Sequence, residues 1–150
     1  MLKLVNYDEC YLQKSLGWLN DQEIQLLIDS NAVINRESQK RWYDAISADS
    51  TYQIWGVEYD GMPIGACGIK HINYADKVGE YWGYIGEKKY WGGKGHALLE
   101  HIYKKAHGLG IELLTLCVLK SNARAVSLYK SEGFVVDSET EERLFMKKRL

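Results

Sequence analysis

The sequence lacks the features that would divide it into domains, carry it across a membrane or attract it to nucleic acid. Its 150 residues include one proline, Pro63, and no linker-like tract of glycine, proline and serine. No apolar run approaches the roughly 18 residues that suggest a membrane-spanning helix. The net charge is −1, so no broad positive field exists to attract nucleic acid or an anionic membrane. We therefore expect one domain, residues 1–150, without nucleic-acid or membrane partners.

Cysteine is scarce as well. The three cysteines, Cys10, Cys67 and Cys117, lie far apart and form no CxxC pair. This spacing argues against a disulfide framework or a zinc site, and we expect no metal cofactor. Cys67 and Cys117 fall in apolar, strand-like runs, where a thiol usually packs in the core. The opening stretch MLKLVNYDECYL lacks the basic and long apolar segments of a secretion signal, so a reducing cytoplasm is the expected location.

The chain does contain regular helical and strand patterns. Asp8 and Asn35 are predicted helix caps, and Asp60-Gly61 is typical of a hairpin turn. Three helices are predicted in the first third of the chain: from Asp8 toward Trp18, over 21–29 and over 36–46. Two more are predicted later, one from the glycine-rich stretch at 92–97 to Gly108 or Gly110 and one after Asn122 up to Gly133. Strands are predicted over 2–6, 52–58, 63–72, 79–86, 111–119, 134–139 and 143–150. The nearly continuous apolar run at 111–119 indicates an inner strand covered on both faces. The order predicts a mixed α/β sheet whose front half is antiparallel.

The stretch YWGGKGHALLE, residues 90–100, places three glycines and a lysine before an apolar helix. Backbone amides at a helix N-terminus attract anions, and glycine lets the backbone approach an anion closely. Lys94 is followed by Gly95, with no serine or threonine next, which excludes the P-loop of nucleotide hydrolases. The third glycine of a dinucleotide-binding fingerprint is also missing. The loop alone leaves two alternatives open: a phosphate site, or a strand-to-helix connection without a ligand.

The segment Gly92-Gly93-Lys94-Gly95-His96-Ala97 resembles the Q/R-x-x-G-x-G/A loop of the GNAT N-acetyltransferases. Gly95 and Ala97 match the small positions, whereas Gly92 stands where the family has glutamine or arginine. The likeness continues through ALLEHIYKKAHGLGIELLTLCVLKSNARAVSLYKSEGFV and covers about residues 52–136. It implies the α/β GNAT fold, a mixed and mostly antiparallel central sheet flanked by helices, with splayed central strands.

The same resemblance implies acetyl-coenzyme A (acetyl-CoA) as co-substrate. In the family, the loop holds the pyrophosphate, and the pantetheine arm lies between the splayed strands, here 79–86 and 111–119. Gly83 is consistent with a bulge or a close backbone approach in the first of these strands. Asn122 matches an asparagine that bonds the arm, although capping the last helix explains it equally well. The implied cofactor-binding residues are Tyr84 and Ile85 through their backbone amides, Gly92, Gly93, Lys94, Gly95, His96, Ala97 and Asn122.

Two catalytic roles are also implied by the resemblance. Tyr129 stands where the family carries a tyrosine that acts as general acid toward the departing thiolate; the alternative is packing of its helix on the sheet. The general base is either Glu80, in the strand where members place a carboxylate, or His71, whose ordinary pKa is close to neutrality. Glu80 lies one position earlier than the usual spacing, so its side chain could face the wrong side of the sheet.

The acceptor is less closely defined. Strand alternation places Glu80, Trp82 and Tyr84 on one face, and an aromatic wall with one carboxylate suits an amine on a sugar ring or nucleobase. The alternative is that the rings pack in the core or in a homodimer. WLND (18–21) and NRESQKRWYDAI (35–46) are similar to acetyltransferases of nucleotide-linked amino sugars. We therefore expect acetyl transfer to a small-molecule primary amine by direct attack in a ternary complex, with a nucleotide amino sugar of surface-glycan biosynthesis as the favoured acceptor. A ribosomal-protein N-terminal or other small-amine acetyltransferase, and a non-catalytic acyl-CoA-binding module, stay open.

Overall fold

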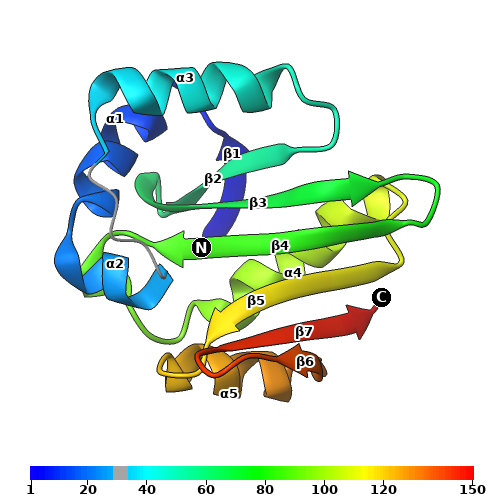
Figure 1. Ribbon diagram of the computed structural model, residues 1–150. Coiled ribbons are helices and arrows are strands. Elements are labelled where there is room, and N and C mark those ends of the chain that lie inside the picture. The colour runs from blue at the N-terminus through cyan, green and yellow to red at the C-terminus, as the bar shows by residue number, and fades with distance from the viewer. Residues whose placement is uncertain (29–33) are drawn as a thin grey trace.

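The computed structural model describes residues 1–28 and 34–150, and within them a seven-stranded sheet lies between two layers of helices (Figure 1). The strands are β1 (Leu2–Asn6), β2 (Gln53–Tyr59), β3 (Met62–Asn73), β4 (Val78–Ile85), β5 (Leu113–Leu119), β6 (Val135–Glu139) and β7 (Arg143–Arg149). The helices are α1 (Glu9–Leu19), α2 (Gln22–Ile28), α3 (Arg36–Ser47), α4 (Gly95–Gly108) and α5 (Ala123–Ser131), with a short 3-10 helix η1 (Lys88–Tyr90). The strand order is β1-β2-β3-β4-β5-β7-β6, and β4–β5 is the one parallel pair among the described residues. The predicted mixed, mostly antiparallel fold is confirmed.

The turn and cap chemistry of the sequence accounts for where these elements begin and end. Asp8 accepts a hydrogen bond from the Tyr11 amide at 3.3 Å, and Asn35 accepts one from the Ser38 amide at 2.8 Å. The β2–β3 hairpin turns through Asp60 and Gly61, whose φ angles of 48° and 84° suit the predicted Asp-Gly turn. These predicted caps and this turn are confirmed. The predicted end of the second helix at Asp29 lies outside the described residues.

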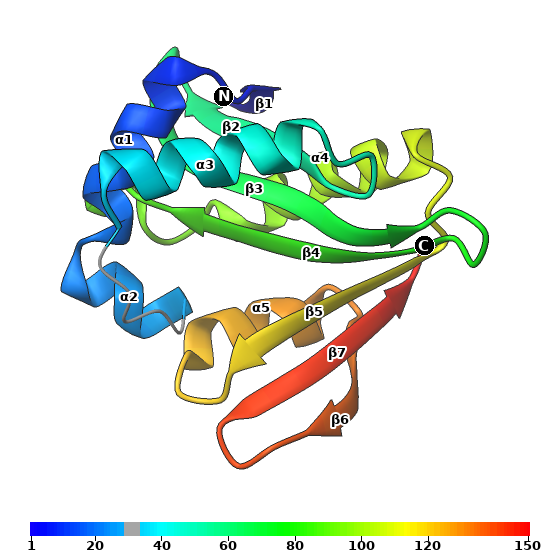
Figure 2. The ribbon, with the colours of Figure 1, turned by 45° about the horizontal axis from the view of Figure 1, so that its top comes forward.

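The helices divide the molecule into a front face, covered by α1, α2 and α3, and a rear face, covered by α4 and α5 (Figures 1 and 2). The rear core includes Cys67, Tyr81, Leu99, Ile102 and Leu114. The front core is richer in aromatic rings and includes Tyr7, Tyr11 and Trp18, with Trp82 and Tyr84 packed against it. Alternation along β4 therefore sends Tyr81 to the rear and its even-numbered neighbours to the front.

The parallel contact between β4 and β5 is very short. Only Val78–Glu80 pair with Leu113–Thr115, and the last matched residues are Glu80 and Thr115. Beyond this point the two strands diverge toward their C-terminal ends, as Figure 2 shows. The predicted splay of the central strands is thus present, and we call the space between the diverging strands the slot.

One prediction about the core is wrong. Cys67 is fully buried, as expected, but Cys117 is exposed. The reason is strand alternation: Leu114, Leu116 and Val118 of β5 point into the rear core, so Cys117 points to the front, where its side chain is exposed. An apolar run in sequence therefore did not mean burial on both faces.

No helix among the described residues combines the length and the apolar character needed to cross a membrane.

Candidate active site

A cavity of about 1680 Å³ opens at the slot and continues onto the front face. One end is formed by the glycine loop and the start of α5, and the other by front-face residues of β3, β4 and α3. Among the predicted site residues, those lining it are Glu80, Tyr84, Ile85, Gly92, Gly93, Lys94, Gly95, His96, Asn122 and Tyr129. Ala97 and His71 are outside the lining. The structure therefore brings together one predicted base, the predicted acid and nearly all of the predicted donor site.

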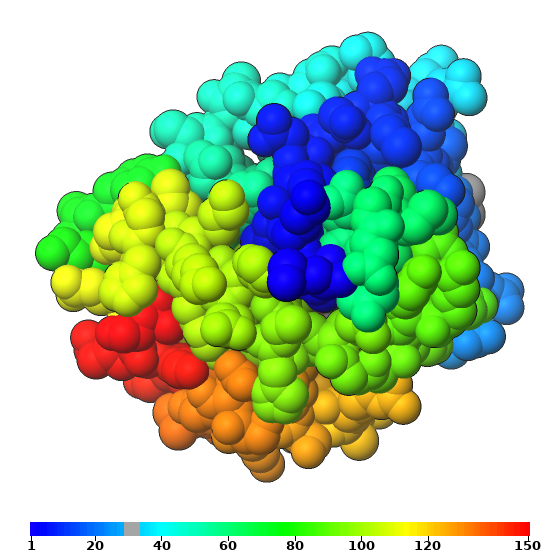
Figure 3. All heavy atoms as spheres, turned by 180° about the vertical axis from the view of Figure 1, so that it is seen from behind, coloured from blue at the N-terminus to red at the C-terminus, as the bar shows by residue number. Residues whose placement is uncertain are grey.

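The glycine loop leads into α4 with an unusual backbone. Gly92 and Gly93 are exposed and have φ angles of 86° and 76°, in the left-handed region that favours glycine. Gly95 opens α4 for a different reason: a Cβ built on it would lie 2.4 Å from a methyl carbon of Leu128 in α5. The small residue thus lets α4 and α5 meet closely, and their surfaces are adjacent in the view from behind (Figure 3). The first turns of two helices consequently border the same end of the cavity.

The side chains of the loop are engaged elsewhere. The Lys94 ammonium lies 4.8 Å from the centre of the Tyr59 ring, a cation–π distance. His96 Nδ1 lies 2.5 Å from Glu132 Oε2. Burial by itself would raise the pKa of Glu132, but hydrogen bonds from His96 and Tyr103 outweigh it and lower that pKa. The loop therefore offers an anion its backbone amides more directly than these two side chains.

Arg124 is a functional candidate that the sequence reasoning missed. It is the second residue of α5 and lines the cavity. A Cβ built on Gly92 would lie 3.6 Å from Arg124 Nη1. The guanidinium therefore occupies the neighbourhood of the side chain that Gly92 lacks at the first loop position. The available signal was an arginine two residues after the expected cap Asn122.

Asn122 has the geometry of a helix cap. Its side-chain oxygen accepts from the Ala125 amide at 3.3 Å, and its amide nitrogen donates to the Leu27 carbonyl of α2 at 3.4 Å. The capping alternative is confirmed. Its lining position leaves the predicted contact with the pantetheine arm as a prediction.

Tyr129 reaches the slot from the rear face. Its ring packs edge-on against Tyr81 and Phe134, with ring centres 6.4 Å and 5.7 Å away. Burial raises the pKa of Tyr129 to about 12, so the phenol keeps its proton throughout the neutral range. Its hydroxyl has no hydrogen-bond partner within residues 1–28 and 34–150. The ring of Tyr129 thus packs its helix against the sheet, while its hydroxyl is available to donate a proton.

Glu80 reaches the slot from the front face, at the point where β4 and β5 separate. His71 Nδ1 lies 3.1 Å from Glu80 Oε1, and Lys70 Nζ lies 3.8 Å from Glu80 Oε2. His71 has a φ angle of 52° within the β3 irregularity, and its side chain is 73% exposed. The structure places Glu80 in the cavity and His71 behind it, in contact with its carboxylate.

Aromatic rings form the front wall of the cavity. Trp42, Tyr52, Trp82 and Tyr84 follow one another at ring-centre distances of 6.4, 6.4 and 6.3 Å. Burial raises the pKa of Tyr52 to about 12, and the charge of Glu80 adds to that rise. Flat apolar surfaces ending in N–H and O–H groups suit a ring-shaped ligand with polar edges.

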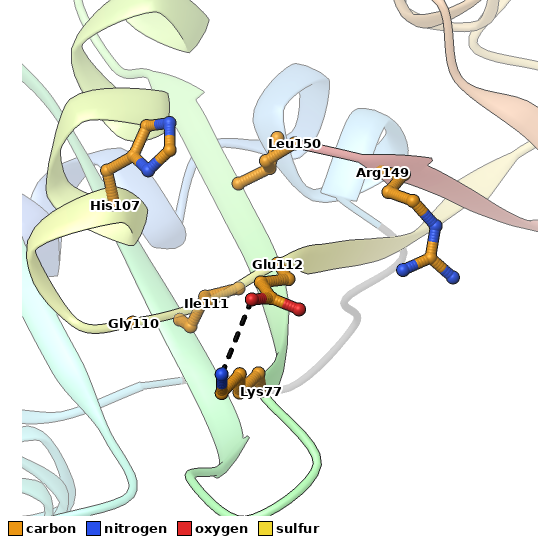
Figure 4. A pocket seen from close by; sticks show the side chains of 7 residues that line it. All are labelled: Lys77, His107, Gly110, Ile111, Glu112, Arg149 and Leu150. Atoms are coloured by element: carbon orange, nitrogen blue, oxygen red, sulfur yellow. Dashed lines mark hydrogen bonds and ion pairs between the residues drawn. The ribbon is translucent and has the colours of Figure 1, made fainter.

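A second hollow of about 350 Å³ lies apart from these residues, near the C-terminus (Figure 4). It is lined by Lys77, His107, Gly110, Ile111, Glu112, Arg149 and Leu150. Its Lys77 and Glu112 form an ion pair at 3.4 Å. None of the predicted catalytic or donor-binding residues borders it, so it is not part of the candidate active site.

A split mixed sheet is combined here with a glycine loop at the start of a helix, and with a tyrosine and a carboxylate that line the same cavity. This arrangement is the one expected of an acyltransferase. The sequence profile of the acetyltransferase (GNAT) family matches residues 18–134. The chain belongs to this family. It is therefore an acetyltransferase of the GNAT family, whose enzymes use acetyl-CoA as co-substrate.

Solved structures share the whole architecture. Spermidine N-acetyltransferase from Vibrio cholerae, in complex with CoA and spermine, is similar with a TM-score of 0.90 at 19% identity, covering 99% of this chain and 95% of that one. Campylobacter jejuni N-acetyltransferase PseH, in complex with acetyl coenzyme A, has a TM-score of 0.78 at 23% identity over 99% of both chains. A domain from Methanocaldococcus jannaschii gives 0.84 at 16% identity, covering 100% and 99%. No curated protein matches by sequence. At these identities the structural similarity establishes the fold alone.

Proposed function

We propose that residues 1–150 form a single domain that transfers the acetyl group of acetyl-CoA to the amine of a nucleotide-linked amino sugar, by direct attack in a ternary complex. The observation that carries the proposal is the cavity itself. It joins the glycine loop at one end to an aromatic wall at the other, where Glu80 is the one carboxylate among the described lining residues.

The donor end fits acetyl-CoA. Exposed amides around Gly92 and Gly93, the start of α4 and the Arg124 guanidinium form a positively polarised cradle for a pyrophosphate. The slot begins beside this cradle and narrows toward the last β4–β5 pair, so an extended arm fits between the strands. The backbone amides near Tyr84 and Ile85 remain the proposed contacts of that arm.

The chemistry follows from the positions of the two titratable groups. Glu80 lies on the front face and Tyr129 on the rear side of the slot. Glu80 would accept the proton of the acceptor ammonium, directly or through a water, which frees the nitrogen lone pair for attack on the acetyl carbon. Tyr129 would donate its proton to the sulfur as the carbon–sulfur bond breaks. His71 acts as a positioning residue for the Glu80 carboxylate.

The charges of the cavity favour an acceptor that carries phosphate. Among the described lining residues Glu80 is the only carboxylate, and Lys70 is the cation beside it, whereas Lys94 and Arg124 lie at the donor end. The similarity to a spermidine acetyltransferase raises a polyamine as the competing acceptor. A polyamine carries several ammonium groups, and each one beyond the reacting amine would need its own anionic or aromatic partner. A phosphate-bearing sugar matches the cavity better.

A free-thiol assay with acetyl-CoA tests the acceptor. Nucleotide amino sugars, spermidine, aminoglycosides and peptide N-termini would be compared at equal concentration. We expect kcat/KM to be highest for a nucleotide amino sugar, by at least about tenfold over spermidine. A preference for spermidine or a peptide would overturn the acceptor assignment. Absence of thiol release with every amine, while acetyl-CoA binds, would support the non-catalytic alternative.

Arg124→Ala tests the donor cradle. Loss of a charged contact to phosphate should raise the Kd for acetyl-CoA by about 10- to 100-fold, measured by calorimetry. Arg124→Lys should recover part of the affinity, because the charge is kept and the planar fork is lost. Arg36→Ala, which removes an exposed arginine from the first turn of α3, is the matched control. Equal affinities of the Arg124→Ala variant and the control would contradict the assignment.

A further inference from the structure

Among the residues that the structure describes, Lys70 is the cation that lines the acceptor end of the cavity beside Glu80. The two residues are direct cross-strand partners in β3 and β4, so their side chains leave the same face of the sheet. Lys70 is 32% exposed and its Nζ lies 3.8 Å from Glu80 Oε2. At this distance the ion pair is loose, and the ammonium keeps donors for another partner.

The proton transfer changes the charge balance of this pair. While Glu80 is ionised, it serves as the counter-charge of the neighbouring ammonium. When Glu80 takes the proton of the acceptor amine, the carboxyl becomes neutral and Lys70 loses that counter-charge. The nearest other group on Glu80 is the His71 ring, at 3.1 Å, which cannot replace a negative charge. A negatively charged group on the acceptor would then replace Glu80 as the counter-charge of the Lys70 ammonium.

The surroundings of Lys70 indicate where such an anion would lie. Diagonally next to it on the front face is Trp82, whose indole packs over its register partner Gly68 and has its Nε1 buried there. A Cβ on Gly68 would lie 2.7 Å from Trp82 Nε1. Tyr52 lies beside the same indole. The ammonium therefore stands at the border of the aromatic wall that suits a sugar ring, with Glu80 at the amine.

We propose that Lys70 binds the phosphate of the acceptor and thereby determines specificity, favouring phosphate-bearing amino sugars and repelling polyamines. The inference rests on the proposed function. The same charge acts in both directions: it attracts an anion one sugar ring away from the amine, and it places a like charge where a second ammonium of a polyamine would lie.

The test compares three acceptors on purified full-length protein: a nucleotide-linked amino sugar, the same amino sugar without phosphate, and spermidine. Lys70→Met should raise the KM for the nucleotide-linked sugar by about 10- to 50-fold, while the KM values for the phosphate-free sugar and for acetyl-CoA change less than about threefold. Lys70→Arg should retain most of the preference. Lys70→Glu should raise kcat/KM for spermidine at least about tenfold.

The control is Lys40→Met, which breaks the exposed Lys40–Asp44 pair at 3.6 Å, outside the cavity. It should leave all three acceptors unchanged. Equal losses on the two sugars in Lys70→Met would overturn the inference, because Lys70 would then act on Glu80 and not on phosphate. Failure of the wild-type protein to acetylate either sugar would instead overturn the proposed function. Thermal unfolding of each variant separates these outcomes from a failure to fold.

Discussion

Replacing Tyr129 by phenylalanine should lower kcat by about 100-fold or more and leave the Kd for acetyl-CoA nearly unchanged. General acid catalysis by a positioned side chain typically contributes two to four orders of magnitude, roughly 10²–10⁴. Phenylalanine keeps the ring that packs on Tyr81 and Phe134, so only the proton donor is lost. Thiol release under saturating substrates measures kcat, and calorimetry measures the Kd.

The pH dependence of kcat in the wild-type enzyme is a second test of Tyr129 as the proton donor. Because burial raises the pKa of Tyr129 to about 12, the neutral, proton-donating form persists well above pH 7. Ionisation of Tyr129 should therefore cause no fall in kcat until the pH approaches that value. The control for Tyr129→Phe is Tyr74→Phe, which removes the hydroxyl of an exposed tyrosine on the β3–β4 turn and should leave kcat unchanged. A Tyr129→Phe variant with wild-type kcat would leave packing as the only role of this residue.

Glu80→Gln should lower kcat by about 100-fold, because glutamine fills the same space and cannot take the ammonium proton. His71→Ala should lower kcat by less than about fivefold, since its mostly exposed ring contacts the carboxylate from outside the cavity. Stopped-flow or steady-state thiol release on both variants measures the difference. The ternary complex should still form, so the Kd for acetyl-CoA should not move.

The opposite order of effects would reassign the base. If His71→Ala lost as much activity as Glu80→Gln, the two residues would act as a unit, or His71 would itself accept the proton. A double variant distinguishes these cases, because residues acting as a unit give losses that do not add. Additive losses would instead mean two separate roles.

Most of the fold could be predicted because its signals are local. Caps such as Asp8 and Asn35, the Asp60-Gly61 turn and alternating strand patterns each specify their element within a few residues. The exposure of Cys117 could not be predicted this way. Burial of a strand face depends on which helices lie over it, and α5 covers β5 from the rear only.

The residues of the candidate site also fall into those that the sequence predicts and those that only the structure identifies. The glycine loop and Tyr129 stand in sequence patterns that resemble those of the family, so the sequence alone predicts both. Lys70 carries no sequence pattern, and the position of Arg124 two residues after the expected cap Asn122 is a weak one. Each residue matters through a neighbour distant in sequence, Gly92 for Arg124 and Glu80 for Lys70. The sequence alone does not decide which face of the sheet the Glu80 side chain occupies. The β3–β4 register decides it, because it places Glu80 on the front face with Trp82.

The three-residue contact between β4 and β5 makes the sheet a structure of two panels joined along a narrow seam. Few backbone hydrogen bonds cross this seam, and the rear core, which includes residues of both panels, supplies the other contact between them. Local opening of a protein costs least free energy where such contacts are few. A donor molecule lying along both strands would bridge the panels and stabilise the closed arrangement, by about 2.7 kcal/mol at a hundred times its Kd. The resistance of this enzyme to unfolding and proteolysis would then rise and fall with the supply of its own acetyl donor.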